Sequence, residues 1–385
     1  MKPLFQLFVL LLPVQLAYHL WPEFAFVYGI RVDYLSPTIY ALELLWFFIF
    51  IVWILKDKNS KVKILKHKRV ILVLLLFAIL NIHFSEVAMV AVLKWLRIGE
   101  FLSLYFFVAN QRWVLQSIKV PILVSMVFTL FLSGLQILKG RSVGGILYWA
   151  GERSFSASSP AIALVSLFGR EFLRPYATFS HPNAMAGYSL VVLFLFIQKE
   201  GLIERTLVLV TSALVFLSFS QNAWLALFLS PAAYFVAKRT NGGFVKFVTT
   251  AAVASFFLTL LRPSVIAREL LQRIELAVVA GKIISLSPLL GIGAGNFIIQ
   301  LPANTVQRPI WFLQPVHNIF LLLAAEIGLI GLLLFVYFVI RNISTKNSLP
   351  VLAILLTGFF DHYWVSFFQN MMLAALVFGC YNAKR

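Results

Sequence analysis

Two short motifs precede the apolar run of residues 319–340: Pro288-Leu-Leu-Gly291-Ile-Gly293-Ala-Gly295-Asn296-Phe297 and Gln314-Pro315-Val-His317-Asn318. The run has about the length that crosses a bilayer as a helix. Pro315 favours an extended backbone just before it, and Asn318 is a preferred N-cap residue. The sequence therefore predicts that His317 lies at the mouth of a membrane helix, at one membrane surface.

A histidine at such a helix end has two chemical uses. A neutral imidazole can accept a proton, so His317 is a candidate general base. The free N–H groups at a helix N-terminus also suit an anionic ligand such as a diphosphate.

The composition predicts an all-α polytopic membrane protein. Hydrophobic residues make up 61% of the chain, charged residues 12%, and the mean hydropathy is +0.92. The net charge of +18 comes from basic residues in short loops between apolar runs, which is the pattern of a membrane protein and not of a nucleic-acid-binding one. Cys380 is the single cysteine, so the sequence offers no disulfide framework and no cysteine-based metal site.

Apolar runs and basic loops together predict about twelve transmembrane helices in a single domain, residues 1–385. The loop at residues 56–69 has seven basic residues against one acid, which places it in the cytoplasm. The expected spans are residues 4–20, 35–55, 70–84, 87–109, 120–138, 184–197, 206–219, 223–237, 244–261, 319–340, 349–360 and 367–381. Alternation then puts both termini in the cytoplasm and leaves two long extracytoplasmic segments, 139–183 and 262–316. The second segment leads to His317, so the candidate base faces outward, where an activated donor must arrive through the lipid.

The two outer segments carry an excess of cations, against the positive-inside trend. There are ten cations: Lys139, Arg141, Arg153, Arg170, Arg174, Arg262, Arg268, Arg273, Lys282 and Arg308. Four acids oppose them: Glu152, Glu171, Glu269 and Glu275. Contact with lipid headgroups or local ion pairing explains most of these cations. Arginine also binds phosphate oxygens in a bidentate manner, and we assign that role to Arg174 and Arg273.

Three motifs at matching spacing resemble the O-antigen ligase and polymerase family. They are the Gly-rich stretch 288–297 with Val316-His317-Asn318, the downstream Glu326-Ile-Gly328-Leu-Ile-Gly331, and the upstream Arg174-Pro-Tyr-Ala-Thr-Phe-Ser-His181-Pro182-Asn183-Ala-Met-Ala186-Gly. Arg273 matches an arginine that the family often carries on an amphipathic outer helix. The resemblance covers roughly residues 170–345.

The resemblance implies a GT-C-like fold, with short amphipathic helices in the outer segments, and a bacterial inner-membrane glycosyltransferase. Such an enzyme transfers a glycan from undecaprenyl diphosphate to a hydroxyl of a glycan, lipid A-core or protein acceptor, on the extracytoplasmic face and without a metal or other cofactor. It implies His317 as the base and Arg174 and Arg273 as diphosphate ligands. We add Asn318 and His181 as further candidate substrate-binding residues.

One position departs from the family pattern. Where the family carries an arginine in a Ser-Arg-x-x-Trp/Leu element, this chain has Gln221, which can donate a hydrogen bond to phosphate but brings no charge. Either the other two arginines hold the diphosphate alone, or the substrate differs, or the activity is reduced.

The sequence is also compatible with other functions. The same family includes repeat-unit polymerases and protein oligosaccharyltransferases. A transporter of lipid-linked sugars is the alternative from another class, and Lys94, Arg97 and Glu100, spaced along one helix face, are its main sequence support. Asp361 and His362 are interpreted either as partners for an arginine or as solvated residues of an outer turn.

Overall fold

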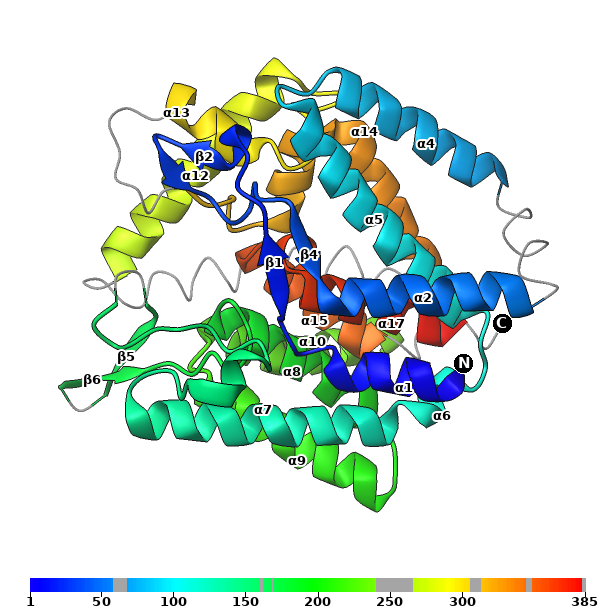
Figure 1. Ribbon diagram of the computed structural model, residues 1–385, viewed down its shortest axis with the longest axis vertical. Helices are drawn as coiled ribbons and strands as arrows, with labels where there is room; N and C mark the ends of the chain where they lie inside the picture. Colours follow the sequence, from blue (N-terminus) through cyan, green and yellow to red (C-terminus); the bar gives the residue numbers. More distant parts are fainter. Residues whose placement is uncertain are drawn as a thin grey trace.

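The computed structural model describes residues 1–57, 68–159, 162–167, 169–239, 266–304, 313–343 and 348–382. Within these ranges the chain forms mainly α-helices (Figure 1). The helices are α1 (Lys2–Leu11), α2 (Ala41–Lys56), α4 (Lys68–His83), α5 (Ala88–Ala109), α6 (Val114–Ser117), α7 (Lys119–Lys139), α8 (Pro182–Phe196), α9 (Leu202–Leu217), α10 (Gln221–Arg239), α12 (Ile266–Leu286), α13 (Leu301–Asn304), α14 (Ile319–Asn342), α15 (Ser348–Phe360), α16 (Tyr363–Ser366) and α17 (Phe368–Asn382).

Within the described residues, short strands form three antiparallel ribbons, so this part of the fold is not purely helical. The pairs are β1 (Ala17–His19) with β4 (Thr38–Tyr40), β2 (Phe26–Val27) with β3 (Ile30–Arg31), and β5 (Leu164–Leu167) with β6 (Arg170–Leu173). Single 3-10 turns lie at Glu23–Ala25, Gly145–Tyr148 and Phe297–Gln300. The first two ribbons lie between α1 and α2 and make up a cap, residues 17–40.

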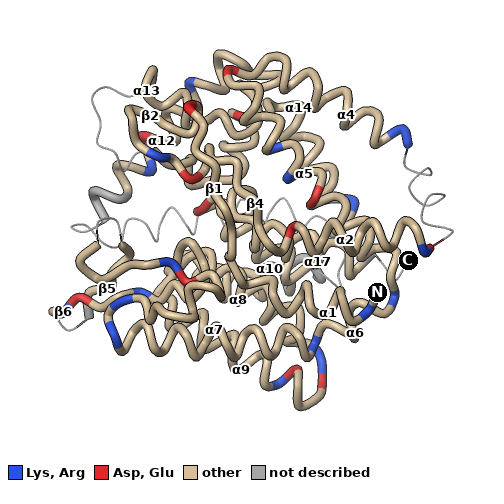
Figure 2. Tube along the Cα trace, viewed as in Figure 1, with Lys and Arg blue, Asp and Glu red and all other residues tan. Residues whose placement is uncertain are grey.

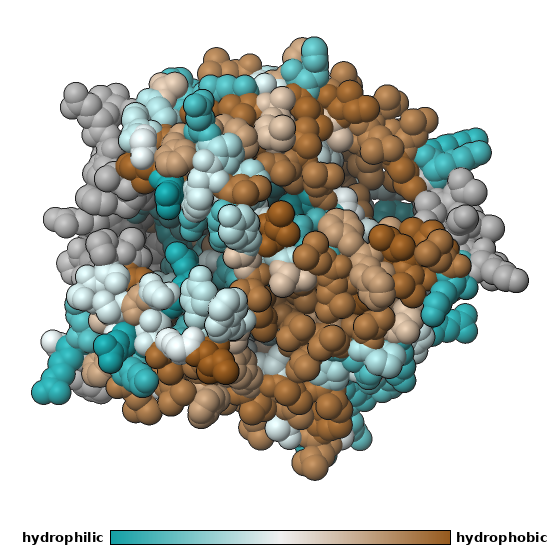
Figure 3. Space-filling model, in the orientation of Figure 1, coloured by the Kyte–Doolittle hydropathy of each residue, from teal (hydrophilic) through white to brown (hydrophobic). Residues whose placement is uncertain are grey.

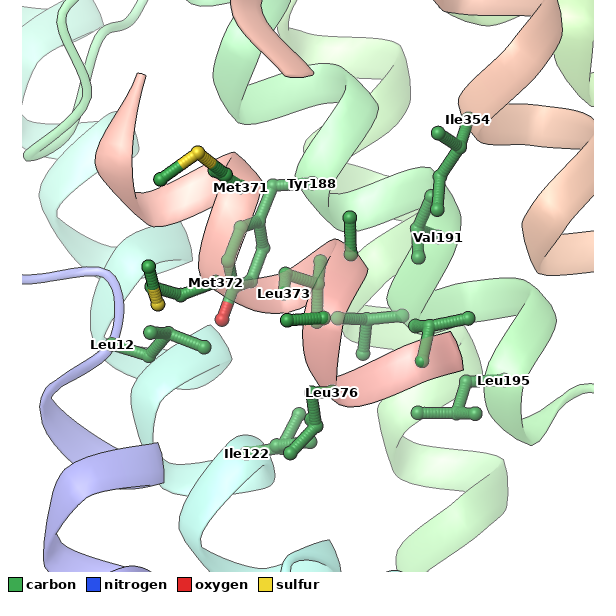
Figure 4. Packing of buried hydrophobic residues seen from close by; sticks show 14 of the residues in the cluster. Leu12, Ile122, Tyr188, Val191, Leu195, Ile354, Met371, Met372, Leu373 and Leu376 are labelled. Carbon is green, nitrogen blue, oxygen red and sulfur yellow. The ribbon is translucent and has the colours of Figure 1, made fainter. Parts of the chain in front are cut away.

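The main hydrophobic core surrounds α8. All residues from Pro182 to Phe196 are buried, and α8 packs against α9, α15, α10 and α17. Figure 4 shows Tyr188, Val191 and Leu195 of this helix packed among side chains of α7, α15 and α17 and near Leu12, which follows α1. Because α8 is enclosed by protein on every side, its apolar sequence is explained by burial among helices rather than by contact with lipid.

The expectation of about twelve transmembrane helices in a GT-C-like arrangement is wrong. Within the described residues, two helices are long and apolar enough to cross a membrane, Lys119–Lys139 and Ile319–Asn342. The other apolar helices are shorter: Lys2–Leu11, Pro182–Phe196, Ser348–Phe360 and Phe368–Tyr381. At 1.5 Å per residue, the 15 residues of α8 span about 22 Å, less than the ~30 Å of a bilayer core. The expected span at 244–261 and most of the basic loop, residues 58–67, lie outside the described residues.

The two long apolar helices indicate association with a membrane. About 39% of the apolar window of α7 and 44% of that of α14 is buried in the protein, so much of each helix is left open. Helix α4 likewise exposes Val70, Leu72 and Val73 by more than half. In Figure 3 apolar side chains cover the area over α2, α4 and α7, whereas polar ones gather over the β-ribbons, where the surface is hollowed. Figure 2 shows charged residues mainly at helix ends and in loops.

Helix α14 is broken at Gly328, which has φ 68° and ψ 179°. The Gly-rich stretch docks into the break: the N–H groups of Ile292 and Gly293 donate to the carbonyls of Ala325 and Glu326 at 3.0 Å. On the other side, the N–H groups of Leu329 and Ile330 donate to Pro288 and Leu289 at 2.8 and 3.3 Å. The backbone groups freed by the break are thus satisfied by another segment of the chain, as buried peptide groups require.

Asn81 of α4 fixes the same junction from a third side. Its amide nitrogen donates to the carbonyls of Leu290 and Glu326 at 2.7 and 3.0 Å, and its oxygen accepts from the N–H of Ala294 at 3.0 Å. The Gly-rich stretch is therefore a fixed part of the helix break. It sets the position of the first half of α14, and with it the position of His317.

Candidate active site

His317 lies at the start of α14, as the sequence predicts. Asn318 is the N-cap: its side-chain oxygen accepts from the N–H groups of Phe320 and Leu321 at 2.9 and 3.0 Å. Its amide nitrogen donates to the carbonyl of Phe359 at 3.0 Å, which ties α14 to the end of α15. The side chain of His317 is 18% exposed, so a substrate can reach it.

Asp361 is the partner of His317. It follows α15, only 4% exposed, and its Oδ1 lies 3.5 Å from Nδ1 of His317. That distance is at the limit of a hydrogen bond, and Nδ1 makes none among the described residues. The same Oδ1 accepts the backbone N–H of His362 at 2.9 Å, while the His362 ring packs 5.3 Å from that of His317.

Asn183 connects this carboxylate to Arg174. Its Nδ2 donates to Oδ2 of Asp361 at 3.0 Å, and its Oδ1 accepts from Nη2 of Arg174 at 2.6 Å. Arg174 follows β6 and also donates through Nε to the carbonyl of Ser218 at 2.9 Å. One continuous chain of contacts therefore runs from the arginine through Asn183 and Asp361 to His317.

His181 caps α8 beside this network. Its Nδ1 accepts the N–H of Asn183 at 3.1 Å, so in the neutral ring the proton is on Nε2. Desolvation, with the positive charges of Arg174, His317 and Arg273, outweighs the opposing charge of Asp361 and lowers the pKa of His181 to about 3. His181 is therefore a neutral hydrogen-bond donor at physiological pH.

Arg273 comes to the site from α12. Its Nη1 donates to the carbonyl of Phe360 at 2.9 Å, one residue before Asp361. The buried side of α12 carries Leu276, Val279, Ala280 and Ile283, which pack in a second hydrophobic cluster with the cap and with Val316. The packing of α12 therefore places Arg273 at the site and supports Val316, the residue before His317.

Burial and charge set the protonation states of the turn after α15. Burial raises the pKa of Asp361, but its contact with His317 and the nearby imidazoles outweigh burial and hold that pKa well below its usual value. Burial lowers the pKa of His362 to about 3. The site therefore holds an ionised carboxylate between a neutral His362 and the candidate base.

His317, Asp361 and His362 also offer donor atoms within 4.8 Å of one another, a spacing that can hold a metal ion. The surroundings are unfavourable for a cation, because one carboxylate provides the negative charge and two guanidinium groups lie close to it. Arg174 is bound to Asn183, which donates to Asp361, and Arg273 is bound to the carbonyl of Phe360. We therefore interpret the carboxylate as the partner of a base and not as a metal ligand.

The structure brings together four of the residues singled out from the sequence, His317, Arg174, Arg273 and His181. Gln221 is exposed at the first position of α10, three residues after the Ser218 carbonyl that holds Arg174. Asn318 uses its side chain for capping. A direct role of these two residues in binding substrate stays a prediction.

From the sequence, Asp361 is either a partner for an arginine or a solvated residue, and Asn183 has no assigned role; the structure adds both to the candidate site. The interpretation of Asp361 and His362 as solvated is wrong, since both are buried. Two features of the sequence point to these residues. Asp361 and His362 form a polar pair between two apolar runs, and Asn183 lies in the motif of residues 174–187.

The charges in α5 have structural partners. Arg97 pairs with Glu43 and with Glu100 (3.1 Å for Glu100), and its guanidinium lies over the rings of Tyr40 and Phe368. Lys94 donates to the carbonyl of Val365. Glu326 faces Lys94 and the backbone N–H groups of Gly295 and Phe297. These contacts favour a packing role, which removes the main sequence support for a transport path.

No family model matches the chain. A comparison with curated proteins likewise gives no match. We therefore infer the function of the protein from the geometry of the site.

Proposed function

We propose that the protein is a metal-independent glycosyltransferase that moves a glycan from a lipid-linked diphosphate, such as undecaprenyl diphosphate, to an acceptor hydroxyl. The observation that carries the proposal is the linked arrangement of an arginine, an asparagine, a buried carboxylate and a partly exposed histidine at one helix mouth. Base and anion-binding groups are thus coupled within one site.

The proposed reaction is a single displacement. His317 takes the proton of the acceptor hydroxyl through Nε2, and the acceptor oxygen bonds to the anomeric carbon of the donor. The bond from that carbon to the diphosphate oxygen breaks, and the diphosphate leaves with the electron pair. Asp361 faces Nδ1 and stabilises the imidazolium that forms.

Arg174 and Arg273 stabilise the charge that develops on the leaving diphosphate. His181 can add a neutral donor from Nε2, and the N-terminus of α8 beside it also favours an anion. The acceptor class decides between a ligase, a repeat-unit polymerase and a protein oligosaccharyltransferase. The arrangement of the site is compatible with all three.

We further propose that the site faces away from the cytoplasm of a bacterial cell. Helix α14 carries His317 at its start and Arg341 in its last turn. Basic residues favour the cytoplasmic side of a membrane helix, which places the start of α14 on the outer side. A donor attached to a long lipid reaches such a site within the membrane.

The test uses purified protein in liposomes with an undecaprenyl-diphosphate-linked glycan and a panel of acceptors. Acceptor-dependent release of undecaprenyl diphosphate is expected for wild type, with loss of ~10² to 10⁴-fold or more for His317→Ala. His83→Ala, at the end of α4, is the matched control and should retain activity. Undiminished release by His317→Ala, when the variant is folded, would refute the assignment. Transfer of intact lipid-linked glycan across the bilayer without release would favour a transporter.

A further inference from the structure

The cap places a rigid turn beside the catalytic residues. Val32 and Leu35 are buried in the cluster that includes Val316 and α12, and the N–H of Leu35 donates to the carbonyl of Val32 at 3.0 Å. The hydroxyl of Ser36 further anchors the turn by donating to the carbonyl of Leu20 at 2.7 Å. Asp33 and Tyr34, the two central residues, are therefore held outward.

Tyr34 presents an aromatic ring at the rim of the site. Its ring stacks on Phe367 with centroids 6.1 Å apart and an interplanar angle of 10°. It meets the edge of His362 at 5.5 Å, and His362 in turn contacts His317. Since 37% of Tyr34 is still exposed, the ring is supported from one side and accessible from another.

Polar groups flank this ring. The carboxylate of Asp33 lies 3.9 Å from Nη2 of Arg153, and both side chains are more than half exposed. Nη1 of Arg153 donates to the carbonyl of Ser180 at 3.2 Å, next to His181. Desolvation by the surrounding protein, followed by the charge of Asp361, raises the pKa of Tyr34, so its hydroxyl remains a donor at neutral pH although part of the ring reaches solvent.

We propose that Tyr34, Asp33 and Arg153 form a binding subsite for a neutral sugar of the acceptor. An aromatic face with a few hydrogen-bonding groups at its edge is the chemistry that binds a polyhydroxylated ring. Because Asp33 compensates the charge of Arg153, the subsite is not selective for an anion, in contrast to the inner arginines. The ring of His362 lies between Tyr34 and His317. A sugar bound to Tyr34 therefore places the next sugar of the same acceptor glycan beside the base.

This inference rests on the proposed function, and its kinetic test is a split between the two substrates. Tyr34→Ala is expected to raise the acceptor KM about tenfold, with the donor KM and kcat nearly unchanged, whereas Tyr34→Phe retains the ring and stays within about threefold of wild type. Tyr18→Ala removes a more exposed tyrosine of the same cap and serves as the matched control. An unchanged acceptor KM in Tyr34→Ala, or an equal change in Tyr18→Ala, would overturn the subsite.

A binding measurement decides the question even when no transfer is found. Saturation-transfer NMR uses the detergent-purified protein with methyl β-glucoside and methyl β-N-acetylglucosaminide as probes. In wild type and Tyr34→Phe, saturation is expected to pass from the protein to the ring protons of the sugar. Tyr34→Ala is expected to lose most of that signal. An absence of signal from wild type with both sugars, or an equal signal from Tyr34→Ala, would refute the subsite. An active enzyme with such a result would leave the transferase proposal intact.

Discussion

Replacing Gly328 by alanine should strongly destabilise the protein, because this residue forms the break in α14. Its φ of 68° and ψ of 179° belong to a region that is essentially restricted to glycine, and a side chain held there costs about 1–3 kcal/mol. A Cβ would also lie 2.1 Å from the carbonyl oxygen of Leu289. Backbone atoms must therefore move.

Moving these backbone atoms also disturbs the Gly-rich stretch that is docked in the break. Shifting Leu289 outward weakens the hydrogen bonds that the N–H groups of Leu329 and Ile330 donate to Pro288 and Leu289. A buried group that loses its partner costs about 1–3 kcal/mol. Added to the backbone strain of about 1–3 kcal/mol, this gives an expected destabilisation of about 2–6 kcal/mol. Transfer activity should fall as well, since the first half of α14 carries His317.

Gly134→Ala provides the matched control. Gly134 lies within α7, and a Cβ added there would meet no atom within 4 Å. Alanine is favoured over glycine in a helix by about 0.5–1 kcal/mol, so this variant should be as stable as wild type or slightly more so. Unfolding by SDS in detergent micelles, followed by tryptophan fluorescence and circular dichroism, measures both. Stabilities of the two variants within about 1 kcal/mol would refute the argument.

Three further predictions concern the site. Asp361→Asn should lower kcat by about 10² to 10⁴-fold with little change in donor KM, because the imidazolium loses its counter-charge; steady-state kinetics checks this, and a change in KM alone would contradict it. Arg174→Lys should be poorly active, since a point charge cannot replace the fork that reaches Asn183; near-normal turnover would remove Arg174 from the diphosphate role. Acidification should destabilise the fold, because His181 and His362 protonate near pH 6.5 when unfolded but only near pH 3 when folded. Their contribution to the free energy of unfolding is complete above pH 6.5 and falls by about 3 kcal/mol per histidine by pH 4.5. Measured at several pH values, the free energy of unfolding should fall less steeply with decreasing pH in His362→Gln than in wild type. An unchanged slope would show that the His362 ring does not contribute to this pH dependence.

Local sequence determined the parts of the site that depend on short-range geometry. Pro315, Asn318 and the apolar run after them suffice to place His317 at a helix start, because an N-cap acts on the next two or three N–H groups. His181-Pro182-Asn183 likewise marks the start of α8. The role of Gly328 was not visible, because its conformation depends on a segment that docks from elsewhere in the chain.

Tertiary structure alone decided how many apolar runs have the form of membrane spans. An apolar side chain is stable in contact with lipid and in contact with other apolar side chains. The sequence of α8 therefore cannot show that this helix is enclosed by protein. The same holds for Asp361, whose role depends on the approach of α15 to the start of α14 and on Asn183 from α8. The sequence by itself determined which helix end carries His317, whereas the carboxylate that faces His317 was decided by packing between distant helices, because such contacts leave no local pattern in the chain.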